Sequence, residues 1–260
     1  MLRFARQALW KSGAIGLFLL LWEFGPIYLA DDATRVFMPP LHEVLAAGAA
    51  LLANGQLQEH LTASLTRSVT GFTFAVASAI VLGLLVAWYR ALDSFLTPLL
   101  ELFRNTAALA LLPVFILLLG IGELSKISIV AFAAFFPVLL NTIAGVRTVD
   151  PLLIRAARSL GLSNFRLFQK VILPSAVPTI FTGIRMAGTS SILVLIAAEM
   201  VGAKAGLGYL IVNAQSSFLI ADMYAGILTV SLLGLAVNFL LVGLERHFSR
   251  WRTAVGAQSL

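Results

Sequence analysis

The sequence predicts an all-α integral membrane protein with six transmembrane helices. Hydrophobic residues make up 60% of its 260 residues and charged residues only 12%, whereas soluble domains average about 25% charged residues. The mean hydropathy is +0.96, and several uncharged runs reach the roughly 20 residues that a helix needs to cross a bilayer. The same composition excludes an intrinsically disordered chain.

The six predicted spans follow the uncharged runs in chain order: residues 12–30, 68–89, 105–122, 127–146, 179–200 and 223–244. The first run passes Glu23, which we place at the outer interface, and the fifth contains Arg185. No small-residue cleavage site follows the first run, so we expect a span there rather than a signal peptide.

Two further segments are too polar to face lipid, but they carry apolar stripes at helical spacing. In residues 206–221 the stripe comprises Leu207, Leu210, Ile211, Ala214 and Phe218. In residues 41–65 one stripe comprises Leu41, Val44, Leu45, Gly48, Leu51 and Leu52, and a second, after a break at Asn54-Gly55, comprises Leu57, Leu61 and Leu65. We therefore expect amphipathic helices that lie at the membrane interface or dip part-way into the membrane.

The distribution of basic residues between the loops predicts the orientation. One side holds Arg35, Lys126 and Lys204. The other side holds Arg3, Arg6, Lys11, Arg90, Arg147, Arg155, Arg158, Arg166, Lys170, Arg246, Arg250 and Arg252. Because lysine and arginine accumulate in cytoplasmic loops, we expect both termini to be cytoplasmic.

The loop at residues 147–178 is long, patterned and on the predicted cytoplasmic side. Asp150 followed by Pro151 predicts a helix start, because aspartate accepts from free N–H groups and proline fits the first helical position. Gly161 predicts the end of this helix after about ten residues. Ser163 predicts the cap of a second short helix, which we expect Pro174 to end.

One face of the first loop helix carries Leu153, Ala156, Ala157 and Leu160. Small alanines on a helix face permit close approach to another surface. Periodicity alone leaves two interpretations open, a helix that rests on lipid headgroups and a docking helix for a partner protein.

The loop also resembles a known signature. Ala156-Ala157, Gly161 and Val171-Ile172-Leu173-Pro174 are similar to the "EAA" motif in the permease subunits of bacterial ATP-binding-cassette (ABC) importers. That motif is Glu-Ala-Ala, three residues, Gly, nine residues and Ile-x-Leu-Pro, and the spacing agrees throughout. One departure is that Arg155 stands where the motif has glutamate.

Four further stretches, residues 55–67, 119–126, 136–142 and 197–209, resemble the subgroup of these permeases for nitrate, sulfonate, taurine and bicarbonate. The resemblance covers about residues 55–252. A second departure is Asn105-Thr106, where the subgroup often carries an Ile-Pro pair. Without that proline we expect a straighter start of the third span.

The resemblance implies a type I ABC importer permease fold in the bacterial inner membrane. It implies a permease domain at residues 55–248 with an ATPase-coupling loop at about 147–178. An N-terminal span with a periplasmic amphipathic segment would precede it at residues 1–54, and a cytoplasmic tail would follow at residues 249–260. The residues carried over to the coupling loop are Ala156, Ala157, Gly161, Val171, Leu173 and Pro174.

The resemblance also implies partners and a cargo. The partners are a cytoplasmic ATP-binding subunit in two copies, a periplasmic substrate-binding protein, and a second permease chain, expected to be an identical copy. The cargo is a small anion such as a sulfonate, taurine, nitrate or bicarbonate, with a pyrimidine precursor or riboflavin as the alternative within the same class.

Two rival functions remain at this point. A secondary transporter is expected to carry carboxylates near the bilayer midplane and inverted repeats, neither of which is apparent, and the patterned loop would go unexplained. A structural subunit without transport would have a sealed interior, whereas Ser, Thr and Asn residues in the spans permit a polar lining.

Four residues in or near the spans are candidates for the solute pathway or a gate. Glu199 ends the fifth span, as part of an outer gate or of a contact with the binding protein, or as an interfacial carboxylate. Arg185 could attract an anion or extend to the cytoplasmic surface. Asn141 could line the pathway or hydrogen-bond between helices, and Ser190 could donate a hydrogen bond to an oxyanion.

The sequence carries no sign of an active site, and we expect no catalytic residue, cofactor or metal. It contains no phosphate-binding loop, so ATP hydrolysis would belong to another chain. It has no cysteine, and His42, His60 and His247 are scattered through predicted loops. The basic residues beside spans report orientation, so the net charge of +6 does not indicate nucleic acid.

Overall fold

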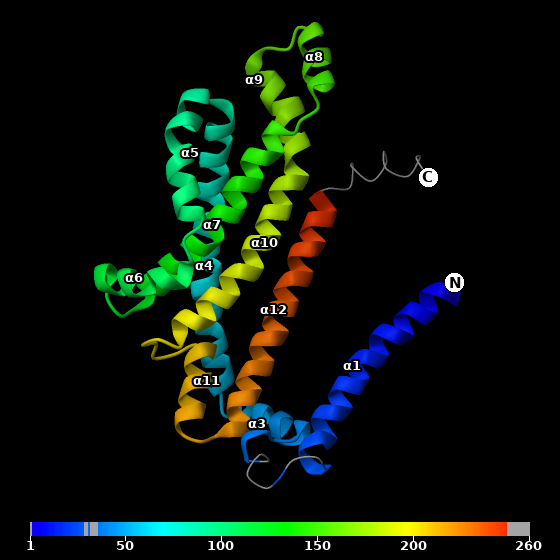
Figure 1. Cartoon of the computed structure of the whole chain (residues 1–260), viewed down its shortest axis with the longest axis vertical. Coiled ribbons are helices and arrows are strands. Elements are labelled where there is room, and N and C mark those ends of the chain that lie inside the picture. Colours follow the sequence, from blue (N-terminus) through cyan, green and yellow to red (C-terminus); the bar gives the residue numbers. More distant parts are fainter. Residues whose placement is uncertain (1, 29–30, 32–35, 249–260) are drawn as a thin grey trace. The chain divides into compact units, whose positions relative to one another are not determined.

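The computed structural model describes residues 2–28, 31 and 36–248, with side chains described from Gly13 onward. The predicted tail at residues 249–260, with Arg250 and Arg252, lies outside this range, as do Arg35 and the side chains of Arg3, Arg6 and Lys11. All elements in the described residues are helical (Figure 1). The chain divides into two compact units, residues 1–63 with 204–231 and residues 64–203 with 232–260.

The first unit contains helices α1 (Leu2–Tyr28), α3 (Leu41–Ala53) and α11 (Leu207–Ser216). It also contains the first turns of α4 (Gln56–Trp88) and of α12 (Ile220–Phe248). Its core is formed by the buried side chains of Val44, Leu51, Leu210 and Ala225. The break predicted at Asn54-Gly55 is confirmed, because α3 ends there and Gly55 has a left-handed φ of 83°.

The three predicted apolar stripes are confirmed in part, and the residues of the stripe in α4, Leu57, Leu61 and Leu65, are half-buried. In α11 the stripe residues Leu207, Leu210, Ile211 and Ala214 are buried. Phe218 is 75% exposed, which contradicts its place in the stripe, because the helix ends at Ser217 and Phe218 turns the chain with a φ of 57°. In α3 only Val44 and Leu51 are buried.

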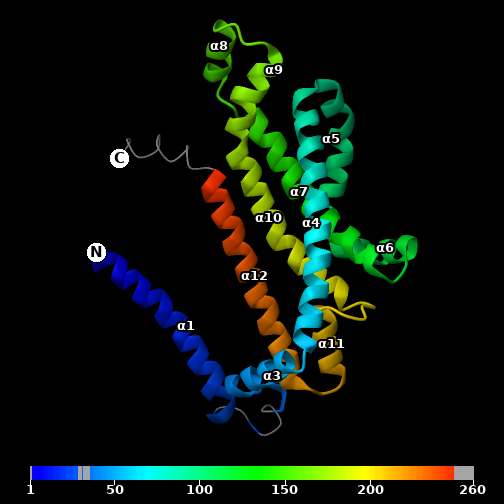
Figure 2. The same ribbon diagram turned by 180° about the vertical axis from the view of Figure 1, so that it is seen from behind.

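The second unit is built around three helices that cross closely: α4, α7 (Glu123–Arg147) and α10 (Leu173–Glu199) (Figure 2). Small side chains let them approach, and the core here includes Ala75, Ala79, Ala134 and Ala187. At Gly183 a Cβ atom would stand 2.5 Å from the Cβ of Asn141, so only glycine fits that crossing of α10 and α7.

Four helices in the described residues are long and apolar enough to span a membrane: 56–88, 123–147, 164–199 and 220–248. They contain the second, fourth, fifth and sixth predicted spans, apart from the terminal Tyr89 and Met200 of two of them. The apolar part of α1, Gly13–Tyr28, has fewer than 18 residues. The six-span count and the cytoplasmic termini therefore stay predictions. The three histidines lie in helices α3, α4 and α12, so their predicted loop positions are wrong.

The third predicted span, residues 105–122, is not one continuous helix. Helix α5 (Arg90–Arg104) ends just before it, and a 3₁₀ turn (Ala108–Leu111) leads into the short α6 (Leu112–Leu119). The two parts are bent by 90° at the break. The expected straightening at Asn105-Thr106 is therefore wrong. Both side chains hydrogen-bond back to carbonyls of the last turn of α5, at 2.8 and 3.1 Å, and help to close that helix without a proline.

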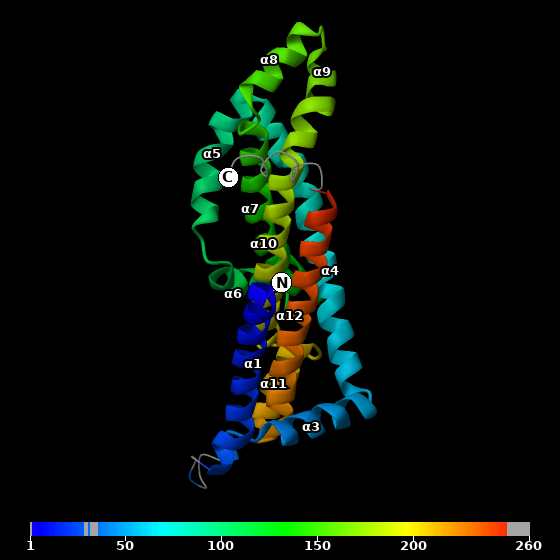
Figure 3. The same ribbon diagram turned by 90° about the vertical axis from the view of Figure 1, so that its right-hand side faces the viewer.

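The first loop helix, α8 (Pro151–Ser159), forms where the sequence predicts it, at one end of α10 (Figure 3). The carboxylate of Asp150 accepts a hydrogen bond from the Leu152 N–H at 2.8 Å. Gly161 has a left-handed φ of 75°, as a helix-ending glycine requires. Ser163 caps α9 (Asn164–Leu167) by accepting from the Arg166 N–H.

Pro174 does not end the second loop helix. Helix α9 passes through a π-turn (η2, Phe168–Ile172) into α10, so that residues 164–199 form one helix. The N–H of Leu173 bonds to the carbonyl of Phe168, five residues back, and this wide turn leaves room for the proline ring that follows. The second half of the predicted loop at 147–178 is thus helical from residue 164 onward and continuous with a candidate membrane span.

The π-turn also explains the spacing of buried residues along this helix. Leu167, Ile172, Ala176 and Ile180 are all buried in one cluster, at intervals of five, four and four residues. A regular α-helix would rotate Leu167 away from that face, because 3.6 residues complete a turn. The extra residue in the wide turn keeps the stripe in phase.

Candidate functional site

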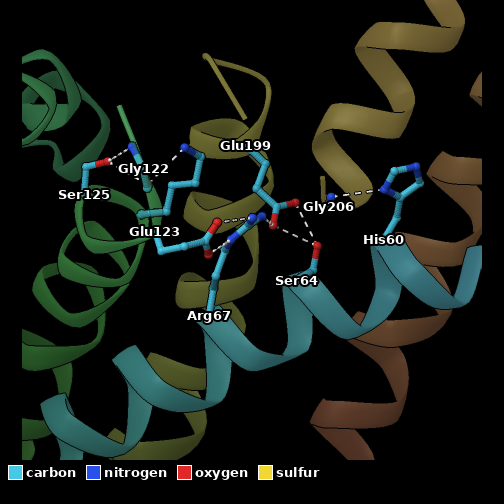
Figure 4. Close-up of polar contacts among 9 residues, drawn as sticks. His60, Ser64, Arg67, Gly122, Glu123, Ser125, Glu199 and Gly206 are labelled. Carbon is cyan, nitrogen blue, oxygen red and sulfur yellow. Dashed lines mark hydrogen bonds and ion pairs between the residues drawn. The ribbon is translucent and has the colours of Figure 1, made fainter. Parts of the chain in front are cut away.

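A largely buried charged cluster lies at the C-terminal end of α10 (Figure 4). Glu199 is 1% exposed, and its two carboxylate oxygens accept from Ser64 Oγ at 2.9 and 2.8 Å. Arg67, on the same face of α4, donates from Nη1 to Glu199 at 2.7 Å. Nε and Nη2 of Arg67 donate to the two oxygens of Glu123 at 2.5 and 2.6 Å. One guanidinium thus joins α4, α7 and α10.

Lys126 contributes a second buried cation beside this cluster. It is 3% exposed, and its Nζ donates to the carbonyl of Gly122 at 3.2 Å. The sequence counted Lys126 among the basic residues between spans on the outer side; the structure places it in the first turn of α7, which begins at Glu123, with its side chain buried. The two buried cations, Arg67 and Lys126, are balanced in formal charge by the buried carboxylate of Glu199 and by the carboxylate of Glu123, whose side chain is 64% exposed.

Glu199 is buried and ion-paired with Arg67, and its position at the membrane interface or at an outer gate stays a prediction. Arg67 lies at the end of a predicted span and carried no role in the sequence interpretation. The sequence feature that could have identified Arg67 as buried is the spacing of residues along α4. Ser64, Arg67, Gly71, Ala75 and Ala79 recur every three or four residues along α4, and all five are buried. A stripe of small residues extended by an arginine indicates that the arginine faces protein.

Arg185, in α10, is paired with α12. Its Nη1 lies 2.9 Å from Oε2 of Glu245, whose other oxygen accepts from Thr182 at 3.2 Å. The sequence offered two interpretations of Arg185, that it attracts an anion or that it extends to the cytoplasmic surface. Neither included an ion pair with Glu245. The pair ties α10 to α12 within the second unit.

Asn141 and Ser190 line a cleft between α7, α10 and the end of α5. Its volume is about 370 Å³, and its polar lining includes Arg104 and Thr106. The side-chain amide of Asn141 donates to the carbonyl of Pro137 in its own helix at 2.8 Å. Ser190 likewise donates to Met186, at 3.1 Å. The sequence placed Asn141 and Ser190 in spans, but it did not connect Arg104 with them.

The loop helix α8 buries one small residue and exposes its large apolar ones. Ala157 is 6% exposed and belongs to a cluster with Leu167 and Ile172. Ala156 is exposed, and Leu153 and Leu160, which share the predicted face, are 51% and 80% exposed. The predicted face is therefore divided, with Ala157 turned toward its own chain. Val171 and Leu173 are half-buried, and Pro174 is exposed.

The described residues contain no group of three or more His, Asp or Glu side chains that could hold a metal ion. The features that stand out are a largely buried ion cluster, a mostly apolar cleft with four polar side chains in its lining, and an amphipathic loop helix on a bundle of helices long and apolar enough to span a membrane. These features define a polytopic helical membrane protein with an exposed loop helix.

The family is shown by sequence. Residues 79–253 match the model of the binding-protein-dependent transport system inner membrane component. The chain belongs to this family and is a permease subunit of an ABC importer, a multi-pass component of the inner membrane.

Curated relatives agree over most of the chain. A probable ABC transporter permease of Brucella abortus is 37% identical over 92% of this chain and 96% of its own. The taurine transport system permease of Escherichia coli is 34% identical over 96% and 92%. The bicarbonate transport system permease of Synechococcus elongatus is 32% identical over 92% and 88%. The resemblance to the sulfonate, taurine and bicarbonate subgroup is thereby confirmed.

Solved structures agree on the fold. A chain of the MetNI methionine ABC transporter, in an inward-facing conformation, superposes with a TM-score of 0.60 at 18% identity, over 74% of this chain and 95% of that one. A chain of an amino acid ABC transporter gives 0.61 at 19% identity, over 78% and 96%. The type I importer permease fold predicted from the sequence is confirmed.

Proposed function

We propose that this chain and a second copy of it together form the membrane pathway of an importer for small oxyanions. A binding protein delivers the solute from the periplasm, and two copies of a separate ATP-binding subunit hydrolyse ATP in the cytoplasm. Relatives at 32–37% identity that are named for taurine, aliphatic sulfonates or bicarbonate support this class of cargo. Each of these molecules carries an anionic oxygen headgroup.

The loop helix α8, with the turn that follows it, is the proposed docking element for the ATP-binding subunit. The observation that carries this proposal is its apolar exposure: Leu152 is 63%, Leu160 80% and Phe165 73% exposed. Exposed apolar side chains clustered on one short segment are typical of a protein interface. Arg155 is exposed on the same helix in place of the motif's glutamate, so the partner surface opposite it would be acidic or neutral.

The remaining coupling-loop residues fix the shape of this element. Ala157 packs α8 against the helix that continues into the membrane, and Gly161 supplies the left-handed turn between them. Val171, Leu173 and Pro174 lie at or just after the π-turn. A load on α8 would therefore act on α10 through rigid helix rather than through a flexible loop.

The test is co-purification of the ATP-binding subunit with tagged, detergent-solubilised permease. Leu160→Asp and Ala156→Trp change exposed positions of the loop, whereas Ala157 is avoided because its replacement would disturb the loop itself. Lys204→Glu is the matched control, since Lys204 is exposed but follows the opposite end of α10. We expect wild type and the control to retain the subunit and both loop variants to lose it.

Loss of the subunit from the control as well, or its retention by both loop variants, would contradict the docking proposal. Proteoliposomes that contain the assembled complex then test the cargo. We expect ATP-dependent uptake of taurine, ethanesulfonate or bicarbonate when the binding protein is present. Absence of uptake for all three would contradict the proposed class of cargo.

A further inference from the structure

Arg104 is the last residue of α5 and lies at the break between α5 and α6. Helix α5 begins at Arg90, directly after the α4 span ends at Trp88, and it ends at Arg104. Fourteen residue steps of 1.5 Å place Arg104 about 21 Å along α5 from Arg90, so a helix that enters the bilayer at Arg90 carries this charge well into a hydrocarbon core of about 30 Å. A charged side chain at that depth is costly unless it faces protein or water.

The cleft at the same break provides such a setting. Arg104, Thr106, Asn141 and Ser190 come from three separate segments and line it together. The chain turns by 90° between α5 and α6, and interrupted helices in membrane proteins occur where the backbone lines a cavity. The polar groups and the broken helix therefore belong to one feature rather than to two.

The donors in the cleft exceed the acceptors that they contact. The guanidinium of Arg104 has five N–H donors, and its recorded ion pair is with Glu101, one turn back, at 3.5 Å with both side chains about half exposed. An ion pair of that length and exposure is weak. The amide nitrogen of Asn141 has two N–H donors, and its bond to Pro137 uses one. This arrangement suits a bound anion.

We propose that the cleft between α5, α7 and α10 is a subsite for the oxyanion headgroup of the cargo. Arg104 supplies the charge, and Asn141 and Ser190 supply hydrogen-bond donors. A planar guanidinium matches a sulfonate or carboxylate with two parallel hydrogen bonds. This inference rests on the proposed function, because it names the part of the pathway that contacts the anion.

Charge-selective labelling tests the subsite without any transport. The chain has no cysteine, so Ser190→Cys introduces a single thiol into the cleft. In lipid nanodiscs we compare its reaction rates with a negatively and a positively charged methanethiosulfonate reagent. The reference is the Ser159→Cys thiol, at an exposed position on α8. We expect the ratio of the anionic to the cationic reaction rate to be about tenfold higher at Ser190→Cys than at Ser159→Cys, because a charged cleft concentrates ions of the opposite charge.

Variants of Arg104 separate its charge from its shape. Arg104→Gln in the Ser190→Cys background should abolish the preference, and Arg104→Lys should keep it. Glu101→Gln should leave the preference intact or raise it, since a competing anion is removed. If the Ser190→Cys thiol does not react while the Ser159→Cys thiol is labelled, the cleft holds no water and the proposal is overturned. An unchanged preference in Arg104→Gln would overturn it as well.

Uptake by the reconstituted complex provides the second readout. We expect Arg104→Gln to lower ATP-dependent uptake of the transported oxyanion at least tenfold while the ATP-binding subunit still co-purifies. Full uptake by this variant would contradict the subsite and leave the importer function standing. A wild-type complex without ATP-dependent uptake would instead contradict the proposed function, and the labelling ratio would still decide whether the cleft attracts anions.

Discussion

Replacing Glu199 by glutamine should destabilise the second unit strongly, although the two side chains have the same shape. Glutamine can still accept from Ser64, but it carries no charge for Arg67, which is 3% exposed. Breaking a buried ion pair by neutralising one partner costs about 3–5 kcal/mol. Arg67 keeps the carboxylate of Glu123, whose side chain is 64% exposed, so we place the loss at about 2–3 kcal/mol.

The assay is the apparent unfolding midpoint of the purified chain in detergent. For a protein of this size about 1 kcal/mol shifts the midpoint by roughly 2–4 °C, so Glu199→Gln should lower it by about 4–12 °C. Glu101→Gln is the matched control, because it removes a carboxylate from an exposed pair worth at most about 1 kcal/mol. It should lower the midpoint by less than about 4 °C.

A double variant gives the sharpest test of the reasoning. Arg67→Met alone leaves Glu199 buried without its cation and should cost at least as much as Glu199→Gln. Combining the two changes removes both charges and should recover part of the loss. If Glu199→Gln unfolds within about 1 °C of wild type, or if the two changes add without recovery, the cluster does not hold α4, α7 and α10 together.

Two further predictions concern glycines. Gly161→Val should leave the amount of inserted protein unchanged but separate ATP hydrolysis from uptake in proteoliposomes. Gly161 has a φ of 75° and open space around the missing Cβ, so the valine costs only backbone strain, about 1–2 kcal/mol. Gly161→Asn is the control, because asparagine tolerates this backbone. Normal coupling in the valine variant would contradict the role of the turn. Gly183→Ala should lower the unfolding midpoint by several degrees, at about 1–3 kcal/mol, because its Cβ would stand 2.8 Å from the carbonyl oxygen of Pro137. Gly234→Ala, with nothing within 4 Å, should leave the midpoint unchanged, and equal midpoints for the two variants would refute the packing argument.

Local patterns predicted the local structure well. The Asp150 cap, the turn at Gly161 and the break at Gly55 each depend on a few adjacent residues, and each is present. The apolar runs located the helices for the same reason, since burial in lipid requires only composition and length. Contacts between residues that lie far apart in the sequence could not be predicted from these local patterns.

The errors arise where tertiary contacts override a local rule. Pro174 is a helix breaker by propensity, but the π-turn before it accommodates its ring. Arg67, Glu123 and Glu199 are separated by at least 56 residues, and no periodicity joins residues on three helices. The bend after Arg104 lies in an uncharged apolar run whose proline, Pro113, stands beyond the bend in the first turn of α6, so composition predicted one continuous span there.

The unbroken helix at residues 164–199 has a mechanical consequence. Its 36 residues span about 54 Å. The loop helix α8 lies next to its N-terminal end, and Glu199 is at its C-terminal end. A tilt of about 5° about one end displaces the other end by roughly 5 Å, about the length of one helical turn. Such a displacement exceeds the reach of the hydrogen bonds from Ser64 and Arg67 to Glu199. The helix cannot tilt about its loop end by that angle without breaking these bonds, unless Ser64 and Arg67 move with it.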